Sequence, residues 1–580
     1  MLVYGDRERV EDPRERLRAI ERRLADAARA PAGLARHAQL VALLIDAGEL
    51  AQGILDEEMA ARGEDDWDSP AARALAALLI SFGRAVCASY ASRFRGAPLP
   101  PPRALERVAR LRLPTAIRVR APEGFVHYAV YPEAYAEAAR DLPPPAIVIG
   151  VRSIGTSLGA IVAARACARL ATVRPIGPPF ARRPSLPPHA RARIAARHAA
   201  LVDEGPGLSG SSLCGLAEWI ADAGALAPPR IFPSHAGPLG PHASASHREL
   251  WRRVDRRVAA FESLRFGDGA PAAALARAAR PLIGALDGEP RDLGAGAWRS
   301  VRYAREADWP PAHVRAERRK YLVRAGGARW LLRFAGLGRH GEERLARARV
   351  LERGGFIPPT VGLLHGFLVQ RWLDGAVSLD VARGCERARL LARLAEYFVF
   401  LAREFPAPPD AGATPAELLA MARHNTSLAL GADAAAVIDR WRARLPRIGR
   451  RVHGDAKLHA CEWLLTRGGA LVKTDALDHH AGHDLVGSQD PAWDLAAAAV
   501  EFDLSPDEEH ALARALAAAS APPAEPRAFF TECYLAFELG RHTLAADSLT
   551  GGESARAEVE RLRRAAESYA RRLALRLRAA

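Results

Sequence analysis

The sequence is poor in cysteine, lysine and long hydrophobic runs, and each shortage excludes a class of protein. Its six cysteines are scattered without a CxxC pair, which excludes a disulfide framework and a zinc-finger site and indicates reduced thiols. Its longest apolar stretch, ALAALLISFGRAVCASYA, is interrupted by Arg84, and the N-terminus carries charges where a signal peptide needs an apolar core. We therefore expect a cytoplasmic protein with no membrane partner.

The charge of the chain is positive, and arginine supplies nearly all of it. Lys and Arg total 82 against 67 Asp and Glu, a net charge of +15. The simplest interpretation is a solvated, arginine-rich surface, although such a surface also attracts phosphorylated molecules and nucleic acids. No zinc-finger spacing and no repeated aromatic and basic pattern favours nucleic acid. A function in nucleic-acid modification would thus rest on the charge alone. The sequence is compatible with a homo-oligomer.

The length of 580 residues exceeds what one hydrophobic core usually serves, so several domains are expected. Residues 1–100 have apolar positions at helical spacing and end in a proline cluster, which predicts a helical N-terminal cap. Residues 101–265 alternate short apolar runs, at 146–150, 199–205 and 230–234, with alanine-rich helices, as parallel α/β sheets do. Residues 266–311 form a predicted linker. Residues 312–580 begin with paired strands split by Gly326-Gly327 and continue as helices, which makes the whole chain multidomain, α/β plus α+β.

The first chemical motif lies in the stretch AALVDEGPGLSGSSLCGLAEWIADAG. Asp203 and Glu204 end an apolar strand, a Gly/Ser loop follows, and a helix begins after the loop. Small residues let backbone N–H groups converge on a phosphate at a helix N-terminus, where Ser209, Ser211 and Ser212 can add hydroxyl donors. Two carboxylates just before the loop can accept hydrogen bonds from neighbouring hydroxyls of a sugar.

This stretch resembles the phosphoribosyl-pyrophosphate motif of type I phosphoribosyltransferases, with Ser209-Gly210-Ser211-Ser212 in place of Thr-Gly-x-Thr. The resemblance implies that Asp203 and Glu204 hold the ribose hydroxyls while the Ser/Gly loop, including Gly210, holds the 5′-phosphate. It also implies phosphoribosyl pyrophosphate as a bound cofactor. The alternative interpretation is that Asp-Glu-Gly-Pro-Gly is merely a turn that ends a strand.

A second element stands about fifty residues upstream, where this family has its pyrophosphate-binding loop. The run IVIGVRSIGTSLGAIVAARA predicts a strand, a loop and a helix. The resemblance implies that the loop contacts pyrophosphate through Arg152, Ser153, Gly155 and Thr156. Between the two motifs lies a Pro- and Arg-rich segment, in the position of a hood that closes over the substrate, with Arg182 and Arg183 as candidate contacts.

The second chemical motif follows the triplet His453-Gly454-Asp455 near the C-terminus. A strand, a Gly-Gly turn and a second strand ending at Asp475 come after it. Asp455 and Asp475 are therefore expected at the ends of neighbouring segments. One carboxylate would orient or deprotonate an attacking hydroxyl, and the other would hold Mg²⁺ on nucleotide phosphates.

From about residue 312 to 575 this pattern is similar to the aminoglycoside phosphotransferase and choline kinase-like family. The resemblance implies a two-lobed kinase-like fold, ATP and Mg²⁺ as cofactors, and a structural role for Asp494. It places Arg333, with Lys320 as the alternative, where the family has a phosphate-binding lysine, and it implies that Glu343 is the helical partner of that residue. The segment QRWLDG, residues 370–375, resembles the hinge that holds adenine.

Two departures from the family pattern concern the metal. Ala460 stands where the family has a metal-binding Asn, so the candidates for the second metal ligand beside Asp475 are Glu462 and His459. We favour Glu462, because a carboxylate suits Mg²⁺ better than an imidazole does. The His-rich insert at residues 478–484 is either a transition-metal site or a solvent-facing loop.

The sequence thus predicts a bifunctional cytosolic transferase acting on small molecules. One half would move a phosphoribosyl group or cleave a ribosyl-linked substrate, and the other would phosphorylate a hydroxyl with ATP. The alternative is a catalytically degenerate sensor that binds nucleotide or phosphoribosyl pyrophosphate in a stress or conflict response. Residues that line acceptor pockets follow no motif, so neither acceptor can be named.

Overall fold

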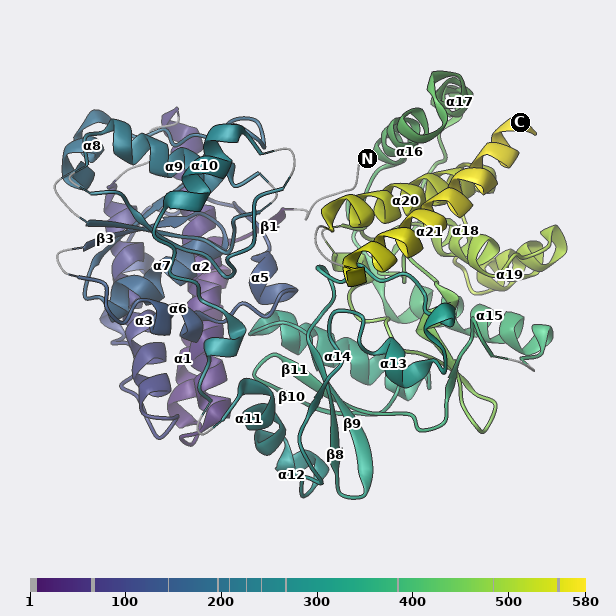
Figure 1. Cartoon of the computed structure of the whole chain (residues 1–580), viewed down its shortest axis with the longest axis horizontal. Coiled ribbons are helices and arrows are strands. Elements are labelled where there is room, and N and C mark those ends of the chain that lie inside the picture. Colours follow the sequence, from purple (N-terminus) through teal and green to yellow (C-terminus); the bar gives the residue numbers. More distant parts are fainter. Residues whose placement is uncertain are drawn as a thin grey trace.

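The chain forms two masses that lie side by side, joined low in the view of Figure 1 by an antiparallel sheet. The computed structural model describes residues 8–63, 68–143, 146–195, 198–207, 209–225, 227–240, 243–266, 269–382, 385–482, 484–549 and 553–579. One mass holds the N-terminal helices and a parallel sheet. The other holds most of the C-terminal helices (Figure 1).

Four helices, all within the predicted N-terminal cap or just beyond it, open the chain: α1 (Pro13–Arg29), α2 (Leu34–Arg62), α3 (Pro70–Ala91) and α4 (Arg103–Ala109). Asp12 caps α1 by accepting the Arg14 N–H at 2.8 Å, and Ser69 caps α3 by accepting the Ala72 N–H at 2.9 Å. By length and composition α2 and α3 could cross a membrane, but 89% of the apolar window of α2 is buried inside the protein. Core helices pass the same test, so this is weak evidence for a membrane, and the cytoplasmic location stays a prediction.

The predicted parallel sheet is present, with strands in the order β4-β3-β5-β6. Its strands are β3 (Ala146–Val151), β4 (Arg169–Val173), β5 (His198–Val202) and β6 (Arg230–Phe232), all paired in parallel. Helix α7 (Ile154–Arg165) packs on β3 and against α2, α3 and α6 (Pro132–Ala138). Helices α8 (Pro188–Ala195), α9 (Ser211–Asp222) and α10 (Ala245–Arg253) lie together above the sheet in Figure 1. The loops after β3 and β5 therefore meet at one edge of the sheet.

A short antiparallel pair, β1 (Arg9–Glu11) with β2 (Ile117–Val119), ties the start of the chain to residues beyond the predicted cap. One hydrophobic core contains residues of α1, α2 and α3 together with residues of the parallel sheet and of strands β8, β9 and β11 described below. The predicted division at residue 100 stays a prediction, but the described helices on either side of it share this core.

The predicted linker carries regular structure of its own. It contains α11 (Pro271–Ala278), α12 (Arg280–Ile283), β7 (Arg291–Asp292) and α13 (Arg299–Arg302). Strand β7 is the edge strand of a five-stranded sheet, and the Arg299 guanidinium forms a buried ion pair with Glu558 at 2.8 Å. The later part of the segment, from β7 onward, therefore packs with the C-terminal half, whereas α11 and α12 contribute residues to the core shared with the N-terminal helices.

The small sheet expected at the start of the C-terminal half has the order β10-β11-β9-β8-β7. Its other strands are β8 (Lys320–Ala325), β9 (Ala328–Phe334), β10 (Thr360–Leu364) and β11 (Phe367–Arg371). The β8–β9 turn uses Gly326 and Gly327, whose φ angles of +57° and +69° suit glycine at a two-residue hairpin. Helix α14 (Arg339–Arg353) packs against β10 and β11.

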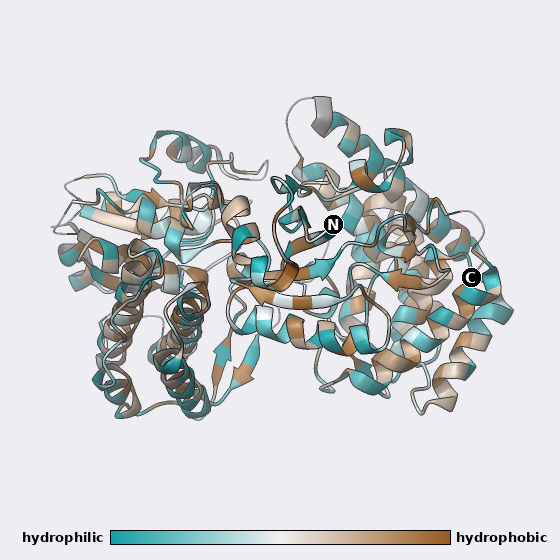
Figure 2. Ribbon diagram, turned by 90° about the horizontal axis from the view of Figure 1, so that it is seen from below, coloured by the Kyte–Doolittle hydropathy of each residue, from teal (hydrophilic) through white to brown (hydrophobic). Residues whose placement is uncertain are grey.

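The remainder is mostly helical and has its own hydrophobic core. Figure 2 shows hydrophobic and hydrophilic stretches alternating along its helices, as expected when each buries one face. The helices are α15 (Arg387–Glu404), α16 (Pro415–Leu430), α17 (Ala432–Ile438), α18 (Pro491–Glu501), α19 (Pro506–Ala518), α20 (Arg527–Ser548) and α21 (Glu553–Arg578). The short strand β12 (Val377–Ser378) precedes them, and between them lie β13 (Pro406–Ala407), β14 (Arg451–Val452), β15 (Trp463–Leu465) and β16 (Leu471–Lys473). The order of a small sheet followed by a helical lobe agrees with the predicted two-lobed architecture.

Candidate functional site

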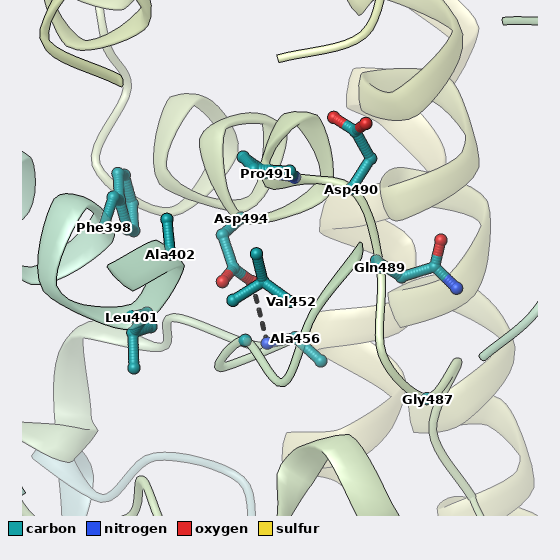
Figure 3. A pocket seen from close by; sticks show the side chains of 11 residues that line it. Phe398, Leu401, Ala402, Val452, Ala456, Gly487, Gln489, Asp490, Pro491 and Asp494 are labelled. Atoms are coloured by element: carbon teal, nitrogen blue, oxygen red, sulfur yellow. Dashed lines mark hydrogen bonds between the residues drawn. The ribbon is translucent and has the colours of Figure 1, made fainter. Parts of the chain in front are cut away.

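The loop that carries Asp455 follows β14, and the Asp494 side chain in the first turn of α18 holds it by hydrogen bonds. The Asp494 carboxylate accepts the Asp455 N–H at 3.0 Å and the Ala456 N–H at 2.8 Å; Figure 3 shows the second of these bonds. Gly454 permits this approach, because a Cβ there would lie 2.4 Å from an Asp494 oxygen. Burial and the neighbouring Asp455 raise the pKa of Asp494 to about 6. This geometry agrees with a structural role for Asp494.

The cavity beside this loop is too small for a substrate. It has a volume of about 10 Å³, room for no more than about one water molecule. It lies on the Asp494 side of the loop, and Asp455 and Asp475 do not line it (Figure 3).

The Asp455 side chain is fully buried and accepts from three donors. Tyr397 Oη donates to one oxygen at 2.7 Å, while Lys473 Nζ lies 3.2 Å and His479 Nδ1 3.0 Å from the other. Because the Asp455 carboxylate is fully buried and already contacts these three groups, a substrate hydroxyl that is to reach it must displace one of them.

Asp475 follows β16, and about a third of its side chain is exposed. Arg333 from β9 donates to it at 2.5 Å, and His479 Nε2 lies 3.3 Å away. Burial opposes ionisation of Asp475, but Arg333 and His479 outweigh it and hold the pKa well below its usual range. The structure therefore brings the two predicted carboxylates to opposite sides of one imidazole ring.

His479 carries a positive charge between these carboxylates. Burial and Lys457 lower its pKa, but Asp475 and Asp455 raise it more, so that the pKa reaches about 9. The His479 imidazolium thus links the two acidic residues through its two ring nitrogens. In the sequence, His479 stands out only as a member of the His-rich insert. Its role could not be predicted there, because Asp455 and Asp475, which it contacts, lie 24 and four residues away in the chain.

Two of the three lysines of the whole chain lie in this site. Lys457 Nζ is 2.7 Å from one oxygen of Glu462, and Lys473 Nζ is 2.6 Å from the other. The fully buried Lys473 also donates to the backbone oxygen of Asp475 at 2.9 Å. Lys473 therefore places an ammonium group where the acidic groups converge. Two features of the sequence could have identified Lys473 as a site residue. Lysine is scarce in the chain, and Lys473 lies in the hairpin of β15 and β16 that ends just before Asp475.

The structure separates the two candidates for the second metal ligand. His459 Nε2 lies 3.2 Å from Glu538 on α20. Ligand atoms of Glu462, Asp455 and His479 lie within 4.8 Å of one another, a spacing that a metal ion can bridge, although both Glu462 oxygens contact lysines. A metal ion held by Asp475 with Glu462 or His459 therefore stays a prediction.

Arg333 lies in the site, but its predicted partner Glu343 does not pair with it. Glu343 is exposed on α14, whereas Arg333 is bound by Asp475 and lies 3.8 Å from Asp478. The next residue of α14, Arg344, faces the site instead and contacts Asp478 at 3.0 Å. Helix α14 therefore contributes an arginine rather than a carboxylate to the site, because one step along a helix turns the side chain by about 100°.

The His-rich insert is not a solvent-facing loop in its described part. Asp478, His479 and His480 are buried or nearly so, and His483 lies outside the described residues. Asp478 is surrounded by the guanidinium groups of Arg318, Arg333 and Arg344. Its charge is therefore neutralised by arginines, which leaves it no role as a transition-metal ligand.

The predicted hinge is covered by residues of the predicted linker. The Arg302 guanidinium stacks on the Trp372 ring, 3.7 Å from its centroid, and donates to the Leu373 carbonyl at 3.2 Å. Tyr303 reaches Asp380 at 3.0 Å. A hinge carbonyl that could receive a hydrogen bond from a base is thus already bonded to Arg302.

About half of this chain is similar to solved structures of choline kinases and aminoglycoside phosphotransferases. Choline kinase LicA from Streptococcus pneumoniae is 14% identical, with 43% of this chain and 90% of that chain covered and a TM-score of 0.28. A choline/ethanolamine kinase family protein from Mesorhizobium loti is 21% identical (44% and 88% covered, TM-score 0.27). Spectinomycin phosphotransferase APH(9)-Ia is 10% identical (51% and 96% covered, TM-score 0.34). No family model and no curated protein matches the sequence. At such scores the likeness carries no functional argument, which therefore rests on the residues.

The first predicted site lies at the carboxyl end of β5 in the parallel sheet. The Asp203 carboxylate accepts the Glu204 N–H at 2.9 Å, and the Glu204 carboxylate accepts the Gly124 N–H at 2.7 Å. Burial raises the pKa of Asp203 to about 7, although the Glu204 N–H opposes this shift. Asp203 and Glu204 thus stand where the pattern placed them, beside the loop that follows β3.

The serines of the predicted phosphate loop contact the hood segment. Ser209 Oγ and Ser211 Oγ donate to the Pro179 carbonyl at 2.8 and 2.7 Å, and Arg182 donates to Ser212 Oγ at 3.4 Å. Gly210 adopts φ +63° immediately before α9. A carbonyl oxygen of the chain therefore occupies the hydroxyl donors that a phosphate oxygen would use.

Of the four predicted pyrophosphate contacts, Arg152 and Ser153 lie in the loop after β3, and Gly155 and Thr156 lie in the first turn of α7. Arg152 is buried and points to the N-terminal helices, where it pairs with Asp56 of α2 at 3.0 Å, so it is not placed to contact pyrophosphate. Ser153 has φ +117°, a conformation rare for a side-chain-bearing residue. Gly155 is required by packing, since a Cβ there would lie 2.6 Å from the Val202 carbonyl. The Thr156 hydroxyl is buried and has no hydrogen-bond partner among the described residues.

We predict that Asp203→Asn changes the pH dependence of stability. Because the folded pKa of about 7 lies above the unfolded value, the stabilising contribution of Asp203 is fully present below about pH 4 and is lost as pH rises through 7. The variant should therefore gain unfolding free energy relative to the parent between pH 4.5 and pH 8 in urea denaturation. The exposed Asp255→Asn is the control. An equal difference at both pH values would contradict the assignment.

Proposed function

We propose that the C-terminal half is an ATP-dependent phosphotransferase for a hydroxyl group of a small molecule. The observation that carries this proposal is that Asp455 and Asp475 both contact the His479 ring, while Arg333 of the small sheet donates to Asp475. A carboxylate that can orient a hydroxyl and a partly exposed carboxylate beside an arginine are the groups that phosphoryl transfer requires.

Each residue has a distinct part in this proposal. Asp455, once one of its donors is displaced, would accept the hydrogen bond of the substrate hydroxyl and take its proton. Arg333 would face the phosphates with a planar, permanently charged group. When bound with nucleotide, Mg²⁺ neutralises phosphate charge, and the partly exposed Asp475 carboxylate would hold it after release from Arg333 or His479.

A second candidate function is nucleotide binding without turnover, as in a sensor of a stress or conflict response. Two observations favour it. The Lys473 ammonium already contacts Asp455 and Glu462, where a metal ion would otherwise bind, and three donors surround the Asp455 carboxylate. Arg302 on the hinge supports the same candidate. Titration of ATP with and without Mg²⁺ by calorimetry, followed by an assay of ADP release, separates the two. Binding without ADP release in the presence of candidate acceptors favours the sensor.

We expect Lys473→Met to let Mg²⁺ support ATP binding at a lower Mg²⁺ concentration than in the parent protein. Removing the ammonium frees an oxygen of Glu462 and leaves one oxygen of Asp455 in contact with His479 alone, and a divalent cation can then replace the lost charge. The concentration of Mg²⁺ that half-saturates ATP binding should fall several-fold in calorimetry. The matched control is Arg440→Met, which removes a cation from the buried Glu532 of α20 and leaves these carboxylates unaltered. An unchanged Mg²⁺ requirement in Lys473→Met would show that Lys473 does not compete for this site.

For the N-terminal half we propose binding of phosphoribosyl pyrophosphate, with transfer of the phosphoribosyl group or cleavage of a ribosyl-linked substrate. Support comes from Asp203 and Glu204 at the end of β5, from the serines at the start of α9, and from Arg182 beside Ser212. The Pro179 carbonyl must leave the serines before a phosphate can bind them. Together the two halves would act on small molecules as one bifunctional cytoplasmic transferase.

A further inference from the structure

A buried cluster of two histidines and one glutamate lies where the two masses of the molecule meet. His37 belongs to α2, Glu133 to α6, and His365 to the turn between β10 and β11. Their exposed fractions are 0%, 0% and 5%. His37 Nε2 and His365 Nε2 both lie 2.7 Å from the same oxygen, Glu133 Oε1. Three groups that can bind a metal thus converge from three segments distant in sequence.

The second oxygen of Glu133 shows that this cluster is incomplete. Glu133 Oε2 is buried and has no hydrogen-bond partner among the described residues. A buried negative charge is costly unless a cation compensates it.

Another buried glutamate of the same helical region shows what compensation looks like. Glu49 of α2 contacts His340 Nε2 at 2.9 Å, in the same way that Glu133 contacts its histidines. Glu49 is also paired with Arg16 and Arg339. In the described part of the chain no arginine or lysine forms an ion pair with Glu133. Glu133 therefore lacks the cation that Glu49 has.

The surroundings of the cluster are aromatic and rigid. The His37 ring lies 4.6 Å from the Phe94 ring, and the His365 ring lies 5.4 Å from Phe266 and 5.0 Å from Tyr131, between ring centroids. Tyr131 Oη donates to the His365 carbonyl at 2.6 Å and so fixes the turn, in which His365 has φ +42°. The ligating atoms are held in place by packing, as a preorganised metal site requires.

We propose that His37, Glu133 and His365 bind a divalent transition metal of the zinc class. Two imidazole nitrogens and a carboxylate form a ligand set that suits Zn²⁺, and the unpartnered Glu133 Oε2 offers a fourth donor atom. The ion would supply the missing positive charge. It would also tie α2 and α6 to the turn of the small sheet, so its role is to fix the two masses together. This site is separate from the kinase-like site and does not depend on the function proposed above.

The test uses the full chain. Metal content is measured by mass spectrometry after purification, after removal with a chelator, and after dialysis against Zn²⁺; Co²⁺ replaces Zn²⁺ for visible absorption spectra. We expect one ion per chain, a d–d spectrum with Co²⁺, and a lower melting temperature after removal.

Glu133→Gln and His365→Asn should weaken Zn²⁺ binding by at least about 100-fold, since loss of an outer-sphere partner alone costs about 10- to 100-fold. Asn is chosen at position 365 because it tolerates positive φ.

The matched control is His340→Gln, which alters an equally buried His–Glu contact that already has arginines. It should leave Zn²⁺ stoichiometry and the Co²⁺ spectrum unchanged. If Glu133→Gln does not fold, His365→Asn and the spectrum of the parent protein carry the test. A parent protein that binds no Zn²⁺ or Co²⁺, or variants that bind as tightly as the parent, would overturn the proposal.

Discussion

Asp455→Asn is expected to lower the rate of ATP-dependent product formation by about 10²- to 10⁴-fold, the usual contribution of a general base. ATP affinity should stay within about threefold, because the base acts on the acceptor hydroxyl rather than on the nucleotide. Asn is nearly the same size as Asp and can still accept from Tyr397, which donates to Asp455 at 2.7 Å. Rate and affinity are measured by ADP release and calorimetry.

The control for this variant is Asp439→Asn. Asp439 is also paired with cations, Arg423 and Arg442, but lies on the surface of the C-terminal half. It should change neither ATP affinity nor ADP release. A normal rate in Asp455→Asn would remove Asp455 from the reaction. Absence of ADP release in the parent protein with every acceptor class tried would favour the nucleotide-binding sensor.

The double variant Asp203→Asn with Glu204→Gln is expected to weaken binding of phosphoribosyl pyrophosphate by more than about tenfold. Each hydrogen bond from a sugar hydroxyl to a carboxylate contributes about 1.5–3 kcal/mol, and about 1.4 kcal/mol corresponds to a tenfold change in affinity. Gln at position 204 keeps an oxygen that can accept the Gly124 N–H. Calorimetry with phosphoribosyl pyrophosphate measures the loss.

ATP affinity of the same double variant should be unchanged, because Asp203 and Glu204 belong to the parallel sheet and not to the kinase-like site. Asp255→Asn with Glu249→Gln, two exposed acids near α10, is the matched control and should bind phosphoribosyl pyrophosphate as the parent does. Equal affinity in the parent and the Asp203/Glu204 variant would show that these carboxylates do not hold the sugar.

Much of the local structure could be predicted from short-range patterns. The apolar runs at 146–150, 199–205 and 230–234 correspond to β3, β5 and β6, and the Gly326-Gly327 pair correctly marks a hairpin. Strand β4 was missed because it is partly exposed and begins with Arg169, so it lacks a continuous apolar run. Strand β7 was missed because two residues carry no periodicity.

The candidate sites were predictable as positions but not as contacts. The motifs indicated Asp455, Asp475, Asp203 and Glu204 correctly as groups at strand ends, since that follows from the order of residues along the chain. The partners of Asp455 could not be predicted, because Tyr397 lies 58 residues away on another helix. For the same reason Arg152 was expected at pyrophosphate, while the fold turns it to Asp56, 96 residues away.

The sequence by itself determined that the chain is globular, that it contains a parallel α/β part followed by a sheet and a helical lobe, and which acidic residues end the strands. These properties depend on hydrophobic periodicity and turn residues, which are local. Only the tertiary structure decided which charges meet: Lys473 and His479 with Asp455, Arg344 with Asp478, and His37 and His365 with Glu133. The physical reason is that a buried charge is stabilised by whichever groups packing brings within hydrogen-bond distance, and packing joins segments that are far apart in the sequence.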